Sequence, residues 1–408
     1  MRYARGYRGP VRSLLTTNLE IKRRSASALL HRSTGAQQWC SAHPSRNNST
    51  ISNTSSLQDT ATEAQQTGFI TLPTAGCARS RATTATSNTT VCGRASSSSA
   101  FRSTRGLLTS SGSFVPPEVS SGRALVECGL VSPRRSVPDN IPKTPYFASG
   151  EVPPPDNVIH LHTPETLVPM REACVLARQM LDLCCAMAQP GVTTDAIDAA
   201  VHSAIVEAGA CPSPLNYHGF PKSVCSSVNE IACHAIPDDR PLLDGDLVSF
   251  DVSVFLKGFH GDNCATVGVG TIDDGAQRLM DATQEAMMKG VSVCRPGACF
   301  TEIGGAIHAV ADEYGFDIVR KYCGHGVGSV FHMLPFVEHC RNDRRLEMVP
   351  GMTFTIEPIF TEGSEATTIW SDGWTVQTVD GGRAAQFEHV VLITEEGHEV
   401  LTVSAPPP

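Results

Sequence analysis

The stretch Leu247–Gly270 reads LVSFDVSVFLKGFHGDNCATVGVG, and it decides the fold. Two runs of apolar and β-branched residues are joined at Lys257 and Gly258, which predicts a β-hairpin. Asp251 lies in the first predicted strand and Asp262 in the second, eleven residues later. A hairpin can bring two such carboxylates close together. A carboxylate in an apolar run is costly unless it is paired with a cation or protonated, so Asp251 is expected to have a partner.

Helical segments that repeat each other lie on either side of this hairpin. The stretches PGVTTDAIDAAVHSAIVEAGA, from Pro190, and PGACFTEIGGAIHAVADEYGF, from Pro296, align without gaps at an offset of 106 residues. In both, a Pro-Gly turn leads into a predicted helix that is followed by a glycine. Each copy follows another predicted helix, over 164–188 and 274–293. We expect two halves related by a pseudo-twofold axis, with a site between them.

The repeat also indicates what two histidines do. His202 and His308 occupy matching positions in the repeated helices, which favours a scaffold role over metal binding for both. From about residue 157, helical segments alternate with short β-branched runs, which indicates a mixed α/β or α+β domain of about 245 residues, 157–405. Residues 116–156 contain nine prolines and are expected to form an extended arm that leads into it.

Residues 1–115 differ in charge from the rest of the chain. They contain 14 Lys and Arg against three acidic residues, a net charge of +11, whereas the whole chain carries −9 and the remainder therefore −20. The acid-poor, Arg-rich opening is typical of a transit peptide, and Ser-rich runs farther on predict disorder. We expect a mitochondrial protein, with the plastid as the alternative address. A disordered basic tail that binds anionic surfaces is the competing interpretation.

The cysteines and the hydropathy exclude two classes of protein. Fifteen cysteines are scattered without a CxxC pair or a secretory signal, so we expect free, mostly buried thiols in a reduced compartment. No apolar run approaches the roughly 20 residues of a membrane span, so a membrane protein is not expected.

Three more segments carry side chains that suit a metal. His325 lies between two glycines in GHG, Glu357 lies in TIEP and Glu388 in QFEH. Both glutamates lie in apolar strand-like runs, so each of them, like Asp251, is costly to bury unless it is paired with a cation or protonated. With the two aspartates they form an oxygen-rich set that suits two divalent first-row metals better than structural zinc. Each carboxylate alone could be a paired core charge or a strand-end cap, but five such side chains together favour a metal site.

From about Ser132 to the C-terminus the sequence resembles the type 1 methionine aminopeptidases. The blocks that carry the resemblance follow the family's order: YHGFPKSVCSSVNEIACHAIP, DGDLVSFDVSVFLKGFHGDNCATV, GHGVGSVFHMLP, GMTFTIEPI and DGWTVQTVDGGRAAQFEHVVLIT. The resemblance implies the α+β pita-bread fold, with a central antiparallel sheet covered by helices in two pseudo-twofold-related halves. The 32 residues from His325 to Glu357 leave no room for the helical insert of type 2 members. The arm VSPRRSVPDNIPKTPYF resembles the organellar subgroup, which lacks the zinc fingers of cytosolic members.

The resemblance implies a metal-binding role for each of the five side chains. Asp251 would bind one ion, His325 and Glu357 the other, and Asp262 and Glu388 would bridge them. Two divalent ions are therefore expected, and Co, Mn, Fe and Zn all suit the set.

The resemblance also implies the catalytic residues. A water held between the two ions would become the attacking hydroxide, and Glu357 would take its proton. His234 and His332 match the family's two non-ligand histidines and would hydrogen-bond the scissile group. The substrate's free amine would bind the metal held by Asp251, which makes the enzyme an exopeptidase. The family usually has glycine where Ala235 stands, beside a catalytic residue, and the effect of this methyl group on turnover stays open.

A substrate pocket follows from the same resemblance. The methionine side chain would enter a pocket that discriminates finitely against leucine, because one methylene is worth only about 1 to 3 kcal/mol. The second residue would have to be small, because the site crowds it near His234. The implied pocket residues are Tyr217, Phe220, Cys225, Phe331 and Trp374, with Pro214 nearby and His218 and His260 as further candidates around the site.

The expected partners are proteins and peptides with an N-terminal methionine, nascent or imported. We expect a ribosome-associated monomer that binds no nucleic acid. An aminopeptidase P or prolidase on the same fold is the enzymatic alternative, although the large preceding domain of those enzymes is missing. A binding module that has lost its metals is the other, although all five metal-binding positions hold the expected residue.

Overall fold

The predicted hairpin forms the centre of the first half of the described structure. In the computed structural model, which describes residues 123–155 and 157–403, strand β4 (Leu247–Leu256) pairs antiparallel with β5 (Phe259–Gly268) over its whole length. Lys257 and Gly258 take φ values of 51° and 87°. Two residues with positive φ are typical of the type I′ turn, whose twist matches that of the strands.

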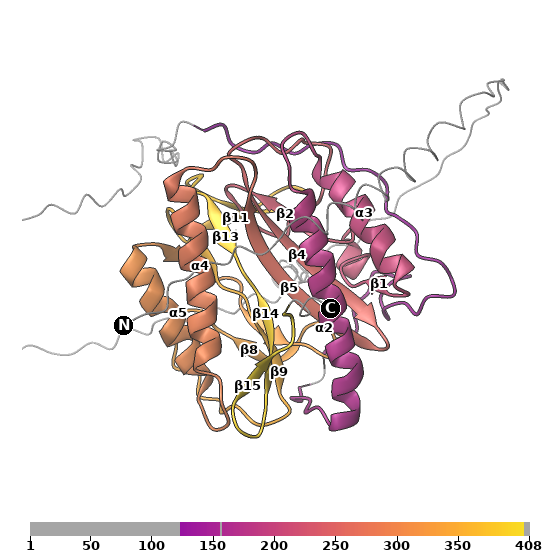
Figure 1. Ribbon diagram of the computed structural model, residues 1–408, viewed down its shortest axis with the longest axis vertical. Helices are drawn as coiled ribbons and strands as arrows, with labels where there is room; N and C mark the ends of the chain where they lie inside the picture. The colour runs from indigo at the N-terminus through magenta and orange to yellow at the C-terminus, as the bar shows by residue number, and fades with distance from the viewer. Residues whose placement is uncertain (1–122, 156, 404–408) are drawn as a thin grey trace, which may run out of the picture. The chain divides into compact units, whose positions relative to one another are not determined.

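Two helices cover one face of this hairpin. Helices α2 (Pro164–Met187) and α3 (Thr194–Glu207) lie against β4 (Figure 1). Strands β1 (Cys211–Pro212) and β2 (Cys225–Val228) pair one after the other with the edge of β4 that lies opposite β5. Alternate β4 residues, Val248 to Val254, are fully buried against the helices. Because successive side chains on a strand point to opposite faces, Asp251 and Ser253 face the other way, toward the interior of the domain.

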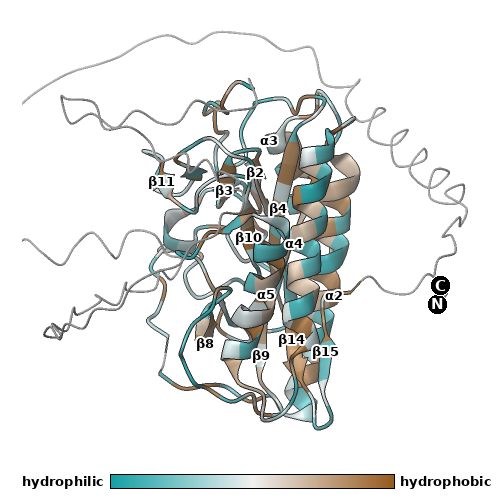
Figure 2. Cartoon of the chain, turned by 90° about the vertical axis from the view of Figure 1, so that its left-hand side faces the viewer, coloured by the Kyte–Doolittle hydropathy of each residue, from teal (hydrophilic) through white to brown (hydrophobic). Residues whose placement is uncertain are grey.

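The second half repeats this construction. Helices α4 (Asp274–Ser292) and α5 (Phe300–Tyr314) pack on a sheet ordered β15 (His398–Val400), β14 (His389–Ile393), β9 (Thr353–Ile356), β7 (Gly324–Gly326), β8 (Met333–Val337). Figure 2 shows hydrophilic and hydrophobic residues mixed along α4, as expected for an amphipathic helix that covers a sheet. The predicted helices 164–188 and 274–293 are confirmed, each ending one residue earlier. The repeated helices α3 and α5 begin 106 residues apart.

Short strands join the halves. One small sheet contains β13 (Ala384–Gln386), β10 (Ile359–Thr361) and β6 (Asp317–Ile318), and another contains β11 (Thr367–Ile369), β12 (Val376–Thr378) and β3 (Ile231–Cys233). The 3₁₀ turn η1 (Tyr217–Gly219) precedes β2. The α+β architecture expected from the sequence is therefore observed.

The predicted arm has neither helix nor strand over its described residues, 123–155. It nevertheless contributes to the core, because Val137 and Ile141 pack with Cys211 and Leu215. Arg135 of the arm binds both Asp195 and Asp198 of α3 at 3.0 Å. The basic region predicted over 1–115 lies outside the described residues, and the domain boundaries stay predictions. Among the described residues, no helix has the length and apolar composition that a membrane span requires.

Candidate active site

The register of the hairpin brings Asp251 and Asp262 to one face. Asp251 lies opposite Cys264, and Asp262 lies opposite Ser253, so the two carboxylates are diagonal neighbours on adjacent strands. The Ser253 hydroxyl donates to Asp262 Oδ1 at 2.6 Å. The two strands thus fix the relative position of the two aspartates, and Ser253 orients one of them.

His325 comes from β7, where two glycines allow neighbouring backbones to approach. A Cβ atom at Gly324 would lie 2.3 Å from the carbonyl oxygen of Thr355, and one at Gly326 would lie 2.1 Å from that of Leu334. Only glycine fits at both positions. Nδ1 of His325 lies 3.1 Å from the Gly326 carbonyl oxygen. That contact favours a proton on Nδ1 and leaves the Nε2 lone pair free for a metal.

The two glutamates complete the group from the second half. Glu357 follows β9, and its Oε1 accepts a hydrogen bond of 2.7 Å from the Thr355 hydroxyl. Its backbone N–H donates to Nε2 of His339 at 3.1 Å. Glu388 lies between β13 and β14, and its N–H donates to the carbonyl oxygen of Cys264 in β5 at 2.9 Å. This hydrogen bond places Glu388 beside β5, the strand of the first half that carries Asp262.

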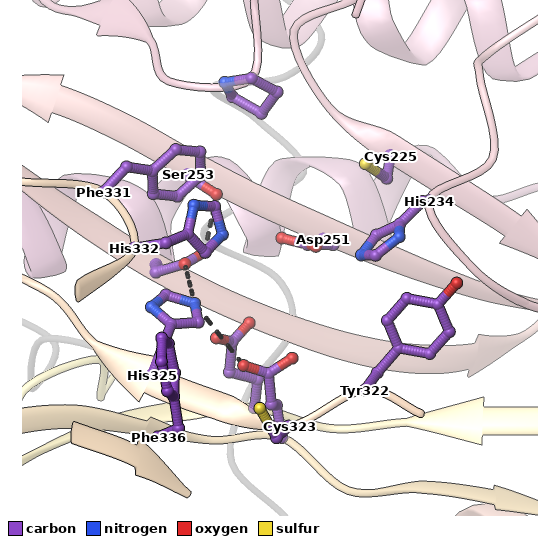
Figure 3. A pocket seen from close by; sticks show the side chains of 14 residues that line it. Cys225, His234, Asp251, Ser253, Tyr322, Cys323, His325, Phe331, His332 and Phe336 are labelled. Carbon is purple, nitrogen blue, oxygen red and sulfur yellow. Dashed lines mark hydrogen bonds and ion pairs between the residues drawn. The ribbon is translucent and has the colours of Figure 1, made fainter. Parts of the chain in front are cut away.

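The five side chains that were predicted to bind metal therefore lie together, and we call them the carboxylate cluster: Asp251, Asp262, His325, Glu357 and Glu388. They line a cavity of about 520 Å³ (Figure 3). Asp262 and Glu388 are each 3% exposed, whereas Asp251 and Glu357 keep part of their surface open. No lysine or arginine is among the described residues that line this cavity.

Burial without a cation is unfavourable for these carboxylates. Burial raises the pKa of Asp262 to about 7. The pKa values of Asp251, Glu357 and Glu388 are raised well above their usual range, first by burial and then by neighbouring carboxylates. Burial also lowers the pKa of His325 to about 4, so its ring is neutral at physiological pH. Four acids beside a neutral histidine need positive charge from elsewhere.

The donor set fits divalent metal ions. Asp262, His325 and Glu388 each present a ligand atom within 4.8 Å of the others. Nε2 of His325 lies 3.6 Å from Asp262 Oδ2 and 3.6 Å from Glu357 Oε1. These separations are too long for hydrogen bonds but leave room for a cation at about 2.1 Å from each atom. Oxygen ligands with one imidazole suit first-row divalent ions.

The two predicted catalytic histidines lie on opposite sides of the carboxylates. In Figure 3, His332 lies beside His325, while His234 lies across Asp251 next to Tyr322. The ring centroids of His325 and His332 are 4.2 Å apart. Burial lowers the pKa of both His234, to about 3, and His332, well below its usual range. His234 has a φ of 59°, a strained conformation for a residue with a side chain.

The predicted substrate-pocket residues form a second group, which we call the aromatic cluster: Tyr146, Tyr217, Phe220, Cys225, Phe331 and Trp374. Its rings meet edge to face, with centroids 5.2 Å apart for Tyr217 and Phe331 and 5.1 Å apart for Phe220 and Trp374. Cys225 and Phe331 also line the cavity of the carboxylate cluster. The aromatic cluster therefore adjoins the carboxylates.

Several lining residues were not identified from the sequence. Tyr322 and Cys323 line the cavity, and the Tyr322 ring lies 5.1 Å from that of His234. Their position directly before Gly324 and His325 was the available signal. Tyr146 comes from the arm, and its hydroxyl donates to the Ser213 carbonyl oxygen at 2.7 Å. No sequence pattern connected this arm residue with the site.

The remaining histidines divide between the site and the scaffold. His260 stacks on Phe331 at 5.0 Å and bonds the Ser213 hydroxyl at 2.8 Å, and His218 lies against Tyr217. His202 lies outside the cavity, where it contacts Ser223 and the carbonyl oxygen of Ser136.

Comparison with known proteins agrees with this arrangement. Residues 169–395 match the metallopeptidase family M24. Methionine aminopeptidase 1B, chloroplastic, of Arabidopsis thaliana is 50% identical over 274 residues, 67% of this chain and 74% of that protein. Methionine aminopeptidase 1D, mitochondrial, of Dictyostelium discoideum is 43% identical over 68% of this chain and 70% of that protein. The crystal structure of methionine aminopeptidase from Rickettsia prowazekii is 42% identical, with a TM-score of 0.59 over 60% of this chain and 100% of that chain.

Proposed function

The chain belongs to metallopeptidase family M24 as a methionine aminopeptidase with the pita-bread fold, and on this premise we propose that it removes the N-terminal methionine of organellar proteins whose second residue is small. The observation that carries the proposal is that the aromatic cluster adjoins the carboxylate cluster, with Cys225 and Phe331 lining the shared cavity. A thioether beside aromatic ring edges gains favourable contacts, which supports methionine as the residue bound there.

We propose that the carboxylate cluster holds two divalent ions. Asp251 would bind one ion, His325 and Glu357 the other, and Asp262 and Glu388 both. When bound, the ions supply Lewis acidity and lower the pKa of water enough for it to act as the nucleophile near neutral pH. The neutral His325 ring and the four carboxylates support this set, because ligands must be free of protons on the atoms that bind.

Glu357 is the proposed proton carrier. Its carboxyl group accepts from the Thr355 hydroxyl at 2.7 Å and from the Gln386 amide at 3.4 Å, which fixes its orientation. A carboxylate in this position can take a proton from water and deliver it to the leaving amine while it also serves as a ligand. These two transfers are the general base and general acid steps of the hydrolysis.

His234 and His332 are the proposed donors to the scissile group. Their lowered pKa values keep both rings neutral, so each can donate one N–H without carrying a charge of its own. Held by burial on opposite sides of the cavity, they would stabilise the charge that develops on the carbonyl oxygen. The crowding of the second substrate residue is assigned to His234 and the adjacent Tyr322.

A peptide panel tests this function. With added Co or Mn, Met-Ala and Met-Gly should be cleaved, Met-Arg poorly, and Leu-Ala more slowly by about one to two orders of magnitude. Equal rates on Leu-Ala and Met-Ala would contradict the assigned methionine pocket. Preferential cleavage of Ala-Pro would instead support an aminopeptidase P or prolidase activity. Trp374→Leu, which changes one wall of the aromatic cluster, should narrow the difference between Met-Ala and Leu-Ala.

We also propose import into an organelle, the mitochondrion first and the plastid as the alternative. The basic, acid-poor residues 1–115 support this address. The relatives include chloroplastic and mitochondrial methionine aminopeptidases. Residues 1–60 fused to a fluorescent reporter should direct it to one of these organelles, and a diffuse cytosolic signal would contradict the proposal. Ribosome association and a monomeric state are proposed as well, to be tested by co-sedimentation and light scattering.

A further inference from the structure

His339 binds the main chain of Glu357 without reaching the active-site cavity. Its Nε2 atom accepts a hydrogen bond of 3.1 Å from the backbone N–H of Glu357. His339 is 3% exposed and is not among the described residues that line the cavity. A backbone N–H can only donate, so Nε2 carries a lone pair and the ring is neutral. His339 can therefore influence the reaction through Glu357 but not by contact with a substrate in the cavity.

The imidazole takes the place of a strand neighbour that the sheet does not provide. The pair Gly326 and Phe354 sets the register of β7 on β9, so Glu357 lies one residue beyond the start of β7 at Gly324. Strand β8 ends level with the start of β7, and the chain continues past it to His339. His339 thus reaches around the end of β7 to a main-chain donor that has no strand beside it. A buried N–H in that position needs such a partner.

The main chain and the carboxylate of Glu357 are held by separate contacts. Pro358 has no N–H and β10 begins at Ile359, so the N–H of Glu357 is the last donor before the next strand. The residue before a proline is restricted to extended conformations, which leaves Glu357 little freedom once its N–H is bound. Its carboxylate accepts from the Thr355 hydroxyl at 2.7 Å. That hydroxyl accepts from the N–H of His325 at 2.9 Å and gives its one proton to Glu357.

Helix α5 fixes the segment that carries His339. A Cβ atom at Gly304, in the middle of α5, would lie 2.1 Å from the carbonyl oxygen of Cys340 and 2.7 Å from that of Glu338. Only glycine allows the helix and this segment to approach so closely. A Cβ atom at the next residue, Gly305, would meet no described atom within 4 Å. The helix interior therefore contains one glycine that the packing requires and one that it does not.

We propose that His339 is a positioning residue for methionine removal: its Nε2 atom holds the main chain of Glu357, and α5 holds His339 through the close approach at Gly304. The inference rests on the proposed role of Glu357 as metal ligand and proton carrier. A carboxylate with both tasks tolerates little displacement, because an error of about 1 Å can cost about 100-fold in rate. Loss of the contact should lower kcat and leave KM, which is assigned to the aromatic cluster, nearly unchanged.

Two substitutions at His339 separate the acceptor atom from the bulk of the ring. His339→Leu fills the space but accepts no hydrogen bond. In the full-length protein at saturating Mn it should lower kcat on Met-Ala by about 10- to 100-fold and keep KM within about twofold. His339→Gln can place an amide oxygen near the position of Nε2, so kcat should stay within about threefold of wild type. A purely structural role would not produce this rescue together with a loss confined to kcat.

Two substitutions in α5 test the same contact from the helix. Gly304→Ala should displace the segment of His339 and lower kcat about tenfold, again with little change in KM. Gly305→Ala is the matched control: it should keep kcat within about twofold and raise the melting temperature, because alanine favours a helix over glycine. The melting temperature of each variant verifies that it is folded. If His339→Leu does not fold, the two alanine variants decide.

Three outcomes would overturn the proposal. The first is a folded His339→Leu whose kcat lies within about threefold of wild type. The second is an equal loss of kcat in His339→Leu and His339→Gln, and the third is equal kcat in Gly304→Ala and Gly305→Ala. Glu357→Gln is the reference for the proposed function. If it loses turnover while one of these outcomes occurs, the role of His339 is wrong and the proposed function stands. If Glu357→Gln keeps its turnover, both are wrong.

Discussion

The carboxylate cluster and the aromatic cluster adjoin each other, but different interactions stabilise them. The aromatic cluster is stable by itself, because its members bury apolar surface and meet edge to face, as Tyr146 and Tyr217 do at 5.0 Å and 82°. The carboxylate cluster gathers like charges in a buried cavity, and the raised pKa values of its acids record the cost. One group is completed by packing and the other by a ligand. Catalysis should therefore fail when the carboxylate cluster is altered, and substrate specificity should change when the aromatic cluster is altered.

The largest expected effect comes from the proposed bridging ligands. Asp262→Asn or Glu388→Gln should lower kcat by at least about a thousandfold, because loss of a shared carboxylate removes the metal's charge stabilisation. Ser253→Ala, which removes only the 2.6 Å hydrogen bond to Asp262, should weaken metal affinity by about 10- to 100-fold. Steady-state kinetics on Met-Ala with metal titration measure both. Near-wild-type turnover in either bridging variant would contradict the dinuclear mechanism.

The pH dependence of metal binding tests the same cluster without mutation. Asp262 has a raised pKa of about 7, so the metal-free protein keeps its proton below that pH and must lose it to bind metal. A raised carboxyl pKa stabilises the metal-free fold at low pH, and this contribution is lost as pH rises through about 7. His325 is neutral throughout this window.

The free energy by which added Mn stabilises the fold should therefore grow from about pH 5.5 to about pH 8, by roughly 1.4 kcal/mol per pH unit for each proton released. Differential scanning calorimetry of metal-free and metal-loaded protein measures it. Asp262→Asn is the control, since its slope should be shallower. A gain that does not change with pH would mean that the buried acids are not the groups that bind.

The two clusters also differ in how far the sequence could predict them. Asp251, Glu357 and Glu388 each interrupt an apolar run, and a charged side chain within an apolar run can be recognised from the sequence alone. The aromatic cluster gives no such signal, because buried aromatics are ordinary core residues. Five of its members came only from the family resemblance. Tyr146 was missed because the arm has no periodicity, and its packing is a tertiary property.

The same distinction applies to the fold. Helices α2 and α4 were predicted to within one residue and the hairpin β4–β5 to within two, because long elements repeat their apolar pattern several times. Strands of two or three residues, such as β6 and β13, contain too little sequence to show a period of two. Ala235 is likewise absent from the described residues that line the active-site cavity, which is a tertiary property that the sequence could not show.

Tyr146 tests whether the arm belongs to the aromatic cluster in function as well as in space. Tyr146→Ala should raise KM for Met-Ala about tenfold with little change in kcat, and should destabilise the protein by about 3 kcal/mol, because it removes a buried ring. Tyr146→Phe keeps the ring and loses only the hydrogen bond to Ser213, so about 1 kcal/mol and a small change in KM are expected. Kinetics and urea unfolding separate the two. A kcat loss in Tyr146→Ala as large as that in Asp262→Asn would contradict the separation of the clusters.

The smallest effect is expected at His202, a buried histidine that belongs to neither cluster. Its ring lies 2.8 Å from the Ser223 hydroxyl and 2.9 Å from the Ser136 carbonyl oxygen, so it ties α3 to the arm. Glutamine can keep one of these hydrogen bonds, and the loss of the other costs about 1 kcal/mol. His202→Gln should therefore lower the melting temperature by about 2 to 4 °C. It should leave kcat and KM on Met-Ala within about twofold of wild type, because His202 belongs neither to the carboxylate cluster, which is proposed to bind the metal, nor to the aromatic cluster, which is proposed to bind the methionine. His332→Gln, a buried histidine beside His325, is the matched control and should lose turnover with little loss of stability. Loss of turnover in His202→Gln at an unchanged melting temperature would contradict this prediction. It would mean that the contact between α3 and the arm affects catalysis, and that the matching positions of His202 and His308 in the repeat do not establish a purely structural role.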